Sequence, residues 1–366
     1  MNSIQRVLAA LTFGRTEHGT PDRVPVFPVP LMQGALVHDC TVEEYFRMPA
    51  EKIADAQIAL NQMLGGVPDA VAGIPNVIQD VTGFGLGLDY HYANSTPAVN
   101  GMLIRDFADI DTLRTPDPQQ SPELVKTLEL ISNLRSRIGG EKVVLGACIA
   151  PFSLPSMLMG TSKWMRLLFT PSLRERYMKR ILDVCESYVA RWSALQVQAG
   201  AHVVVLADGM ASASMLPESM FKRHALPVIK RAIAAVPGMA AYEAVGRVEP
   251  FVDYFRDLGA VALLLGEEDD IATCKRRLGN RLGLIGNVNN MKLRRWSPAR
   301  AEMKAKQALR DGMEGYGFIL ANQGPELPFD VSVDNIQSLV NCVEKFGRYD
   351  KDKSPRSRRT EPALAC

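Results

Sequence analysis

The sequence lacks the cysteine pairs that cross-link small secreted proteins or hold structural zinc. Its six cysteines are scattered and none belongs to a Cys-x-x-Cys pair, so neither a disulfide framework nor a zinc ribbon is predicted. It also lacks the features of a secretory signal peptide and any uninterrupted apolar run of about 18 residues. We therefore expect a cytoplasmic protein that does not enter a membrane.

The sequence also lacks a clear excess of either positive or negative charge. The 42 basic and 40 acidic residues leave a net charge of +2, and the body of the chain has no basic run with interleaved aromatic side chains. Nucleic acid is therefore not an expected partner. A hydrophobic share of 47% with 22% charged residues is typical of a globular protein with a sizeable core.

Apolar, β-branched runs alternate with helical patterns along the chain. A short amphipathic helix is predicted over residues 4–11, and Thr41 and Glu44 have the spacing of a helix-capping box. Eight strands, each followed by a helix, predict an α/β fold, a closed (β/α)8 TIM barrel. The alternative is an open doubly wound sheet, but no GxGxxG loop follows the first strand. The predicted strands cover residues 24–30, 69–73, 142–150, 202–208, 239–243, 260–266, 282–287 and 317–322.

Two segments depart from this regular alternation. Residues 76–118 contain no clear helical pattern, so we expect an elaborated loop after the second strand, with a hairpin near residues 89–92 that caps the barrel mouth. The barrel is expected to be one domain over residues 1–347. Residues 348–366 are charged and poor in apolar side chains, which predicts a disordered tail.

In a parallel barrel the chemistry takes place at the carboxyl ends of the strands. Asp208 and Glu243 end neighbouring strands, with Tyr242 beside Glu243, and two acids beside apolar walls are candidates for proton transfer. The structural alternatives are an ordinary turn at Asp208 and an ion pair between Glu243 and Arg247. The predicted substrate-binding residues are Met32, Gln33, Cys148, Asn287, Gln323 and Glu326, with His91 from the cap loop.

Other titratable residues favour structural roles. The acidic run over residues 267–270 is typical of a helix amino terminus. His202 opens its strand and His224 lies within a predicted helix, so both are interpreted as structural.

Several motifs occur in one order across residues 4–346. They are RVLAAL, DRVPVFPV, APFSLPSMLMG, ADGMASASMLPESMF, HALPVIKR, LGLIGNVN and GFILANQGPELPFDVSVDNIQSLV. Together they resemble the uroporphyrinogen decarboxylase superfamily, a (β/α)8-barrel family, and the similarity is clearest with its corrinoid-dependent methyltransferase branch. The resemblance implies a partner protein that presents a corrinoid (cobalamin) and a small-molecule methyl donor or acceptor. Self-association within the family also makes a homo-oligomer an expectation.

Two departures from the family pattern narrow the expected activity. Decarboxylases of the family hold an acidic tetrapyrrole with arginine after the first strand, but no arginine lies between Arg23 and Arg47, which disfavours that reaction. Thiol-directed methyltransferases of the family bind zinc through a His-x-Cys motif after the fifth strand and a cysteine after the eighth. The matching residues here are Glu243, Val245 and Pro325. The resemblance thus implies no thiolate zinc site, and any bound metal is expected on Glu243 and Asp208.

The function expected from these observations is methyl transfer between a small organic substrate and the corrinoid of a partner protein. An example is O-demethylation of an aryl methyl ether, with Glu243, Tyr242 or Asp208 acting as acid or hydrogen-bond donor at the leaving oxygen. Two alternatives stay open. One is a decarboxylase or lyase of a small carboxylic acid, and the other is a non-catalytic barrel that binds a corrinoid protein.

Overall fold

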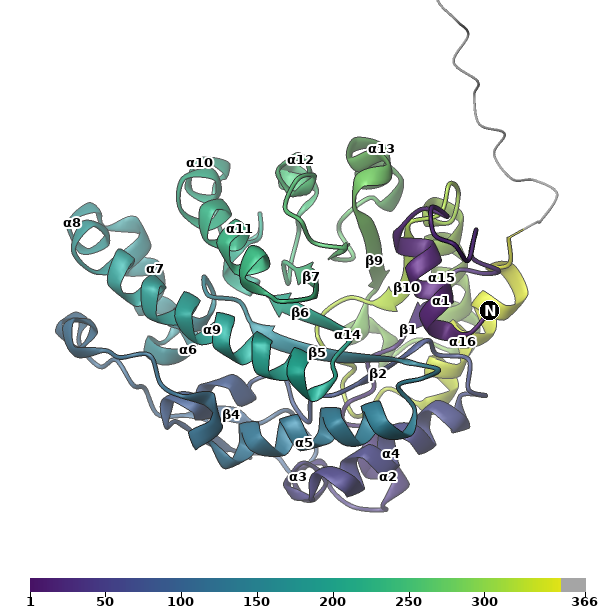
Figure 1. Ribbon diagram of the computed structural model, residues 1–366, viewed down its shortest axis with the longest axis horizontal. Coiled ribbons are helices and arrows are strands. Elements are labelled where there is room, and N and C mark those ends of the chain that lie inside the picture. The colour runs from purple at the N-terminus through teal and green to yellow at the C-terminus, as the bar shows by residue number, and fades with distance from the viewer. Residues whose placement is uncertain (350–366) are drawn as a thin grey trace, which may run out of the picture.

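All eight predicted strands are present in the computed structural model, which describes residues 1–349, and they form one parallel sheet (Figure 1). The strands follow the order β1-β10-β9-β8-β7-β6-β5-β2 around the barrel. Helices surround this sheet, so the predicted (β/α)8 TIM barrel is confirmed. The strands are β1 (Val26–Phe27), β2 (Ala70–Ala72), β5 (Val143–Ile149), β6 (Val203–Ala207), β7 (Met239–Glu243), β8 (Ala262–Leu264), β9 (Gly283–Val288) and β10 (Phe318–Asn322).

The predicted amino-terminal helix is present over Ser3–Leu11. Thr41 caps another helix, and the Glu44 side chain completes the predicted capping box. The helical region over residues 161–199 is interrupted before Pro171 and continues through a π-helical turn, Arg174–Met178. No helix within residues 1–349 combines the length and apolar character needed to cross a membrane. The helices are α1 (Ser3–Leu11), α2 (Gly34–Val37), α3 (Val42–Arg47), α4 (Ala50–Met63), α5 (Pro122–Arg137), α6 (Leu154–Met159), α7 (Thr161–Phe169), α8 (Pro171–Leu173), α9 (Lys179–Ala199), α10 (Glu218–Met220), α11 (Leu226–Ala235), α12 (Val252–Phe255), α13 (Ile271–Leu278), α14 (Asn290–Leu293), α15 (Pro298–Gly312) and α16 (Val333–Phe346).

The barrel closes between β1 and β2 through Asp69. The Asp69 N–H donates to the Val26 carbonyl, and the Asp69 carboxylate accepts from the Val26 N–H, both at 2.9 Å. Arg6 of α1 and Arg23 also contact this carboxylate, at 2.6 and 2.8 Å. Asp69 is fully buried, and a buried carboxylate needs such charged and hydrogen-bonding partners. One side chain therefore joins α1, β1 and β2.

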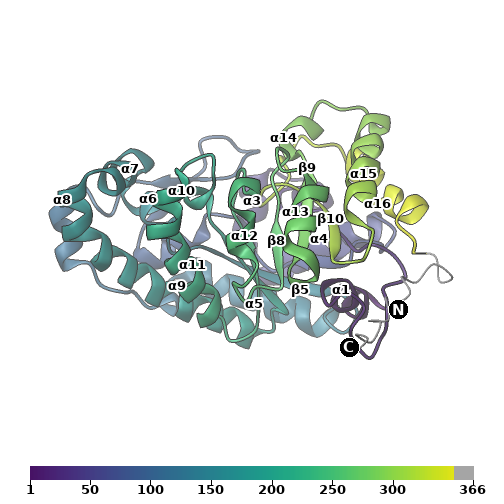
Figure 2. The same ribbon diagram turned by 90° about the horizontal axis from the view of Figure 1, so that it is seen from above.

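Helix α1 covers the amino-terminal end of the barrel. Its Val7 and Leu11 side chains reach the barrel axis and line the cavity there. The Ala10 carbonyl of the same helix accepts from the Gly317 N–H, just before β10. In Figure 2, α1 lies at the bottom of the barrel, and α14, which follows β9, lies at the top. At the opposite end of the barrel, where the strands have their carboxyl ends, the connecting loops form the mouth.

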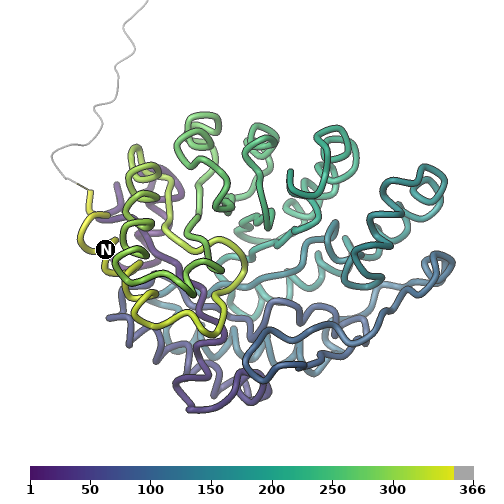
Figure 3. Tube along the Cα trace, turned by 180° about the vertical axis from the view of Figure 1, so that it is seen from behind, coloured from purple at the N-terminus to yellow at the C-terminus, as the bar shows by residue number. Residues whose placement is uncertain are grey.

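The elaborated loop after β2 is built from short elements. It contains the 3-10 helices Gln79–Phe84 and Phe107–Thr112 and the hairpin β3 (Gly87–Asp89) with β4 (Ala98–Asn100). This segment is blue in Figure 3 and runs out beside the teal helices, where Asp111 pairs with Arg176. The Thr96 hydroxyl, between the two hairpin strands, donates to Glu326 beyond β10. The predicted hairpin is thus present, and it reaches the barrel mouth.

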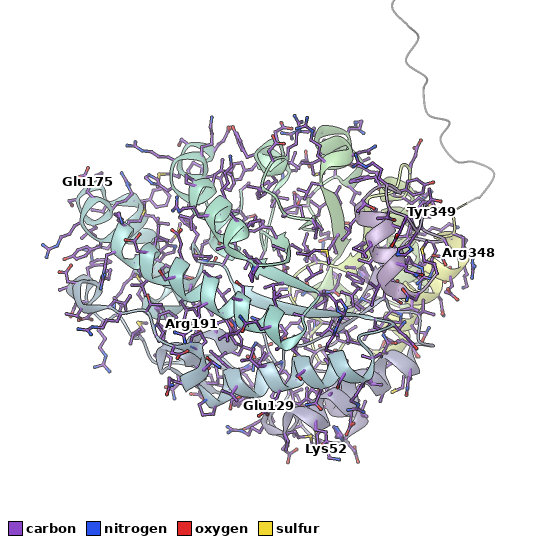
Figure 4. The ribbon with its side chains drawn as sticks, in the orientation of Figure 1. Lys52, Glu129, Glu175, Arg191, Arg348 and Tyr349 are labelled. Carbon is purple, nitrogen blue, oxygen red and sulfur yellow. The ribbon has the colours of Figure 1, made fainter. Side chains whose placement is uncertain are left out.

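The packed structure continues past the predicted domain boundary at residue 347. Arg348 forms an isolated β-bridge with Arg23, and the Tyr349 N–H donates to the Asp22 carbonyl at 3.1 Å. The Tyr349 ring packs edge-on against Tyr316, with 4.9 Å between the ring centroids. Figure 4 shows both residues beside α1 and α16. Residues 348 and 349 therefore belong to the barrel, and the rest of the predicted tail, 350–366, lies outside the described residues.

The first testable prediction concerns the closure at Asp69. We expect Asp69→Ala to lower the free energy of unfolding by about 3–5 kcal/mol, because it leaves two buried guanidinium groups without their shared partner. Urea denaturation followed by circular dichroism measures this. The control Asp257→Ala removes an ion pair with Arg281 whose side chains are both largely exposed, and it should cost less than about 1 kcal/mol. Equal losses in the two variants would show that Asp69 does not hold the barrel closed.

Candidate active site

The barrel axis contains a cavity of about 90 Å3. On β6, β7 and β8 the residues that line it take alternate positions, because successive residues of a strand point to opposite faces of the sheet. Strand β6 contributes Val203, Val205 and Ala207, and β7 contributes Ala241 and Glu243. The polar residues of the lining are few: Asn76, Gln79, Asp80, Cys148, Glu243 and Asn322. The cavity is therefore apolar, with polar groups mainly toward the carboxyl ends of the strands.

Glu243 lies where this cavity meets the barrel mouth. It is the last residue of β7, and it also lines an outer hollow of about 360 Å3 together with Val245, Gln323 and Pro325. Only 3% of Glu243 is exposed. Its Oε1 atom is buried without a hydrogen-bond partner among residues 1–349, and it forms no ion pair with Arg247, the structural alternative. Burial raises the pKa of Glu243 to about 8. At neutral pH this carboxyl group is therefore mostly protonated and free to donate its proton.

The turn after Glu243 requires glycine at position 246. Gly246 has a φ of +128°, which L side chains rarely adopt, and a Cβ atom there would lie 2.7 Å from the Ser212 hydroxyl. The Arg247 carbonyl in turn accepts from the Ala213 N–H at 2.8 Å. The loops after β6 and β7 thus pack closely together, which holds the end of β7 in place.

Asp208 and Tyr242 do not join Glu243 at the cavity. In the register of β6 and β7, Ala207 pairs with Glu243, so these two side chains face inward and Asp208 and Tyr242 face the helices. The Asp208 carboxylate accepts from the Ser153 hydroxyl and, at 3.0 Å, from the Tyr242 hydroxyl. Burial raises the pKa of Asp208 to about 6. The expected pair of cavity acids is therefore not formed, because Asp208 lies one position beyond the inward-facing residue.

Asp80 is a cavity acid that the sequence reasoning missed. Its carboxylate accepts from the Ile149 N–H at 2.6 Å and from the Trp192 indole N–H at 3.0 Å, and burial raises its pKa to about 7. It lies in a 3-10 helix of the elaborated loop, so a search of strand ends does not find it. The only signal in the sequence is an acid within the apolar stretch Val77–Val81.

Two of the predicted substrate-binding residues line the cavity or the hollow. Cys148 is among the residues around the cavity, but it pairs with Leu206 in the register of β5 and β6, so its side chain faces the helices. Its sulfur accepts there from the Gln196 amide of α9 at 3.1 Å, and burial raises the pKa of its thiol. Gln323 lines the outer hollow, and its side-chain oxygen accepts from the Glu267 N–H. Gln323 therefore stays a candidate for substrate contact, and the Cys148 thiol does not.

The other predicted binding residues lie outside these two spaces. Gln33 is buried against the loop after β10, where its amide donates to the Pro328 carbonyl at 2.7 Å. Asn287 donates to the Gly266 and Asp269 carbonyls. Glu326 is tied to Thr96, and burial raises its pKa to about 7. The residues that line neither space are Met32, which is buried, Gln33, Asn287, Glu326 and His91, whose side chain is 63% exposed.

The acidic run over residues 267–270 and His202 make structural contacts. The Asp270 carboxylate caps α13, and Asp269 accepts from the backbone N–H groups of residues 248, 249 and 266. The His202 ring accepts from the Val144 N–H at 3.0 Å, and burial together with Arg135 lowers its pKa to about 4. His224 lies in the π-helical turn Phe221–Ala225, away from the cavity and the hollow.

The three positions matched to zinc ligands do come together in the structure. Glu243, Val245 and Pro325 line the same hollow, but none of them offers a thiolate or an imidazole. Within the described residues, no three His, Cys, Asp or Glu side chains are grouped as metal ligands. Asp208 faces away from Glu243, so these two acids cannot chelate one ion. The residues present do not fit a thiolate zinc site.

The second testable prediction is a pH dependence of stability. Folding raises the pKa of Glu243 from 4.5 to about 8, so its contribution to stability is complete below pH 4.5 and is lost as the pH rises through 8. Relative to Glu243→Gln, the wild type should lose up to about 1.4 kcal/mol of unfolding free energy per pH unit across this window. Urea denaturation at a series of pH values measures the difference.

The control for this series is Glu175→Gln. Glu175 is exposed at the edge of the molecule, beyond α8 (Figure 4). This variant removes one negative charge from the surface, so it shows how much of the pH profile comes from the loss of charge alone. If Glu243→Gln and Glu175→Gln give the same flat profile, Glu243 is not held protonated by burial.

Comparisons with known proteins agree with this architecture. The family model for uroporphyrinogen decarboxylase (URO-D) matches residues 4–346. A uroporphyrinogen decarboxylase of Cellvibrio japonicus is 25% identical over 291 residues, which cover 75% of this chain and 78% of the relative. A methylcobamide:CoM methyltransferase (MtbA) of Methanosarcina mazei is 23% identical over 306 residues, covering 82% and 86%.

A solved structure shares the same fold. A methyltransferase from Methanosarcina mazei superposes with a TM-score of 0.82 at 22% identity, covering 94% of this chain and 99% of the other. The predicted resemblance, with corrinoid-dependent methyltransferases among the relatives, is thus confirmed. Because the family model spans nearly the whole barrel, the chain belongs to the uroporphyrinogen decarboxylase family.

Proposed function

We propose that this protein is a methyltransferase that moves a methyl group between a small organic substrate and the corrinoid of a partner protein. The single observation that carries this proposal is Glu243, a buried and unpartnered carboxyl group at the barrel mouth. An acid held protonated at neutral pH is suited to protonate a leaving group. An aryl methyl ether is a substrate of the right chemistry, because its phenolate leaving group needs a proton.

The hollow outside Glu243 is the proposed place of reaction. It lies at the carboxyl ends of the strands and is lined by Glu243, Val245, Met291 and Gln323, among others. Met291 and Val245 are exposed apolar side chains, so a partner protein can approach this rim. The substrate would lie between Glu243 and the partner's corrinoid, which in its reduced form supplies the electron pair for the new bond to the methyl carbon.

The role of the barrel is then positioning and proton donation. As the methyl group leaves, the electron pair of the oxygen–carbon bond stays on oxygen, and the Glu243 proton moves to that oxygen. Holding the methyl carbon in line between its two partners accounts for the rest of the rate enhancement. In the reverse direction the Glu243 carboxylate takes up the proton again, so one arrangement serves both directions.

We do not propose a thiol as the acceptor of the methyl group. The methyltransferase relative is named for coenzyme M, but the three positions matched to zinc ligands are Glu243, Val245 and Pro325 here. Cys148 is buried with a raised thiol pKa, and no cysteine of the described part of the chain, residues 1–349, lines the hollow. The residues at the barrel mouth therefore offer no means of converting a thiol to its thiolate.

The third testable prediction measures this proton. With a reduced corrinoid protein and an aryl methyl ether, wild type should convert the corrinoid to its methylated form, followed by absorbance. Glu243→Gln keeps the size and a hydrogen-bond donor but has no acidic proton, so the rate constant should fall about 10²- to 10⁴-fold. Glu175→Gln should react like the wild type. Equal rates in the wild type and Glu243→Gln would exclude Glu243 as the acid.

The same assay separates the two alternatives. Release of carbon dioxide from a small carboxylic acid without any corrinoid would identify a decarboxylase or lyase. A stable complex with a corrinoid protein that never turns over would identify a non-catalytic barrel. Within residues 1–349, no cationic side chain lines the cavity or the hollow, which weighs against a carboxylic acid substrate.

A further inference from the structure

The barrel core is incompletely filled beneath Glu243. Cores of (β/α)8 barrels are usually packed solid with branched side chains. Here Ala72, Ala147, Ala207, Ala241 and Ala321 take inward-facing positions on five different strands and line the cavity of about 90 Å3. Alanine cannot reach across the barrel axis, so these residues create the space that larger side chains would occupy. The space opens toward Glu243, whose Oε1 atom has no hydrogen-bond partner within residues 1–349.

Among the residues that the structure describes, none that lines this cavity is cationic. No lysine, arginine or histidine within residues 1–349 lines either the cavity or the outer hollow. The two acids of the cavity are both fully enclosed, and Asp80 has its oxygens occupied by Ile149 and Trp192. A charged group placed among the alanines would lose its hydration without gaining a partner, which is strongly unfavourable.

We infer that the alanine-lined cavity is a binding subsite for the apolar part of an uncharged substrate, whose reacting oxygen lies at Glu243. This inference rests on the proposed function and adds to it the substrate class and the residues that select it. The substrate enters from the mouth with its apolar part directed toward α1. Its methyl group then points outward, toward the partner protein.

The size of the cavity limits what it can hold. An apolar cavity of about 150 Å3 in another protein stays dry and binds benzene. The cavity of about 90 Å3 is smaller, so it fits a short alkyl chain or one edge of an aromatic ring. The remainder of a ring would lie at the level of Glu243, where the cavity meets the hollow.

The fourth testable prediction uses anisole as the uncharged probe and 4-methoxybenzoate as its charged counterpart. Isothermal titration to the wild type should show anisole binding at least about tenfold more tightly than 4-methoxybenzoate, since the carboxylate has no cationic partner. Ala241→Leu fills the cavity and should weaken anisole binding by about 10- to 200-fold. Ala207→Val is the milder filling variant, and it decides the result if Ala241→Leu does not fold.

The matched control is Val125→Leu. Val125 lies on α5, is 36% exposed and lines neither the cavity nor the outer hollow, so this variant should bind anisole like the wild type. Thermal unfolding of each variant establishes that it is folded. The subsite is refuted if anisole does not bind, if both filled variants bind it like the wild type, or if 4-methoxybenzoate binds as tightly as anisole.

Failure of the subsite and failure of the proposed function give different results. Anisole binding that depends on Ala241 and Ala207, without any methyl transfer, would support the subsite and contradict the methyltransferase. Methyl transfer that proceeds unchanged in both filled variants would support the methyltransferase and refute the subsite.

Discussion

Closure of a parallel barrel is the constraint on which the rest of this structure depends. Because all eight strands run in one direction, their carboxyl ends meet at a single mouth, and every residue there is held by two neighbouring strands. The ring is joined at β1 and β2 by Asp69, whose buried carboxylate binds two arginines and a backbone N–H. The covered amino-terminal end stabilises the fold, and the open end is available for chemistry.

Hydrogen bonding distinguishes Glu243 from two other buried acids of the barrel. Asp80 and Asp208 are as deeply buried as Glu243, but each is hydrogen-bonded to neighbouring donors. Glu243 has no partner for its buried oxygen and stands at the top of an apolar cavity. An unsatisfied polar group costs stability, and in the proposed function the leaving oxygen of the substrate completes this hydrogen bond. Strand β7 carries both Glu243 and Ala241, and the small side chain of Ala241 leaves space in the cavity beneath Glu243.

Sequence patterns predicted most of the fold but only part of the site. The strands and Glu243 follow from apolar runs that end at a polar residue, and such runs are local. Asp208 also ends a run, but whether a strand end faces the cavity depends on register with its neighbour, and Ala207 takes the inward position. Asp80 lies in an irregular loop whose path depends on contacts with β5 and α9. Tyr349 lies in a charged segment and is held by Asp22 and Tyr316, which are distant in sequence.

Glu243 places a carboxyl group at the position to which the family resemblance assigns a zinc ligand. Glu243, Val245 and Pro325 surround that position and offer no thiolate. The most direct measurement is the zinc content of the purified protein after exposure to zinc and dialysis against a weak chelator, compared with Glu243→Gln. We expect far less than stoichiometric zinc, with no difference between the two proteins. Stoichiometric zinc in the wild type that is lost in Glu243→Gln would contradict the account.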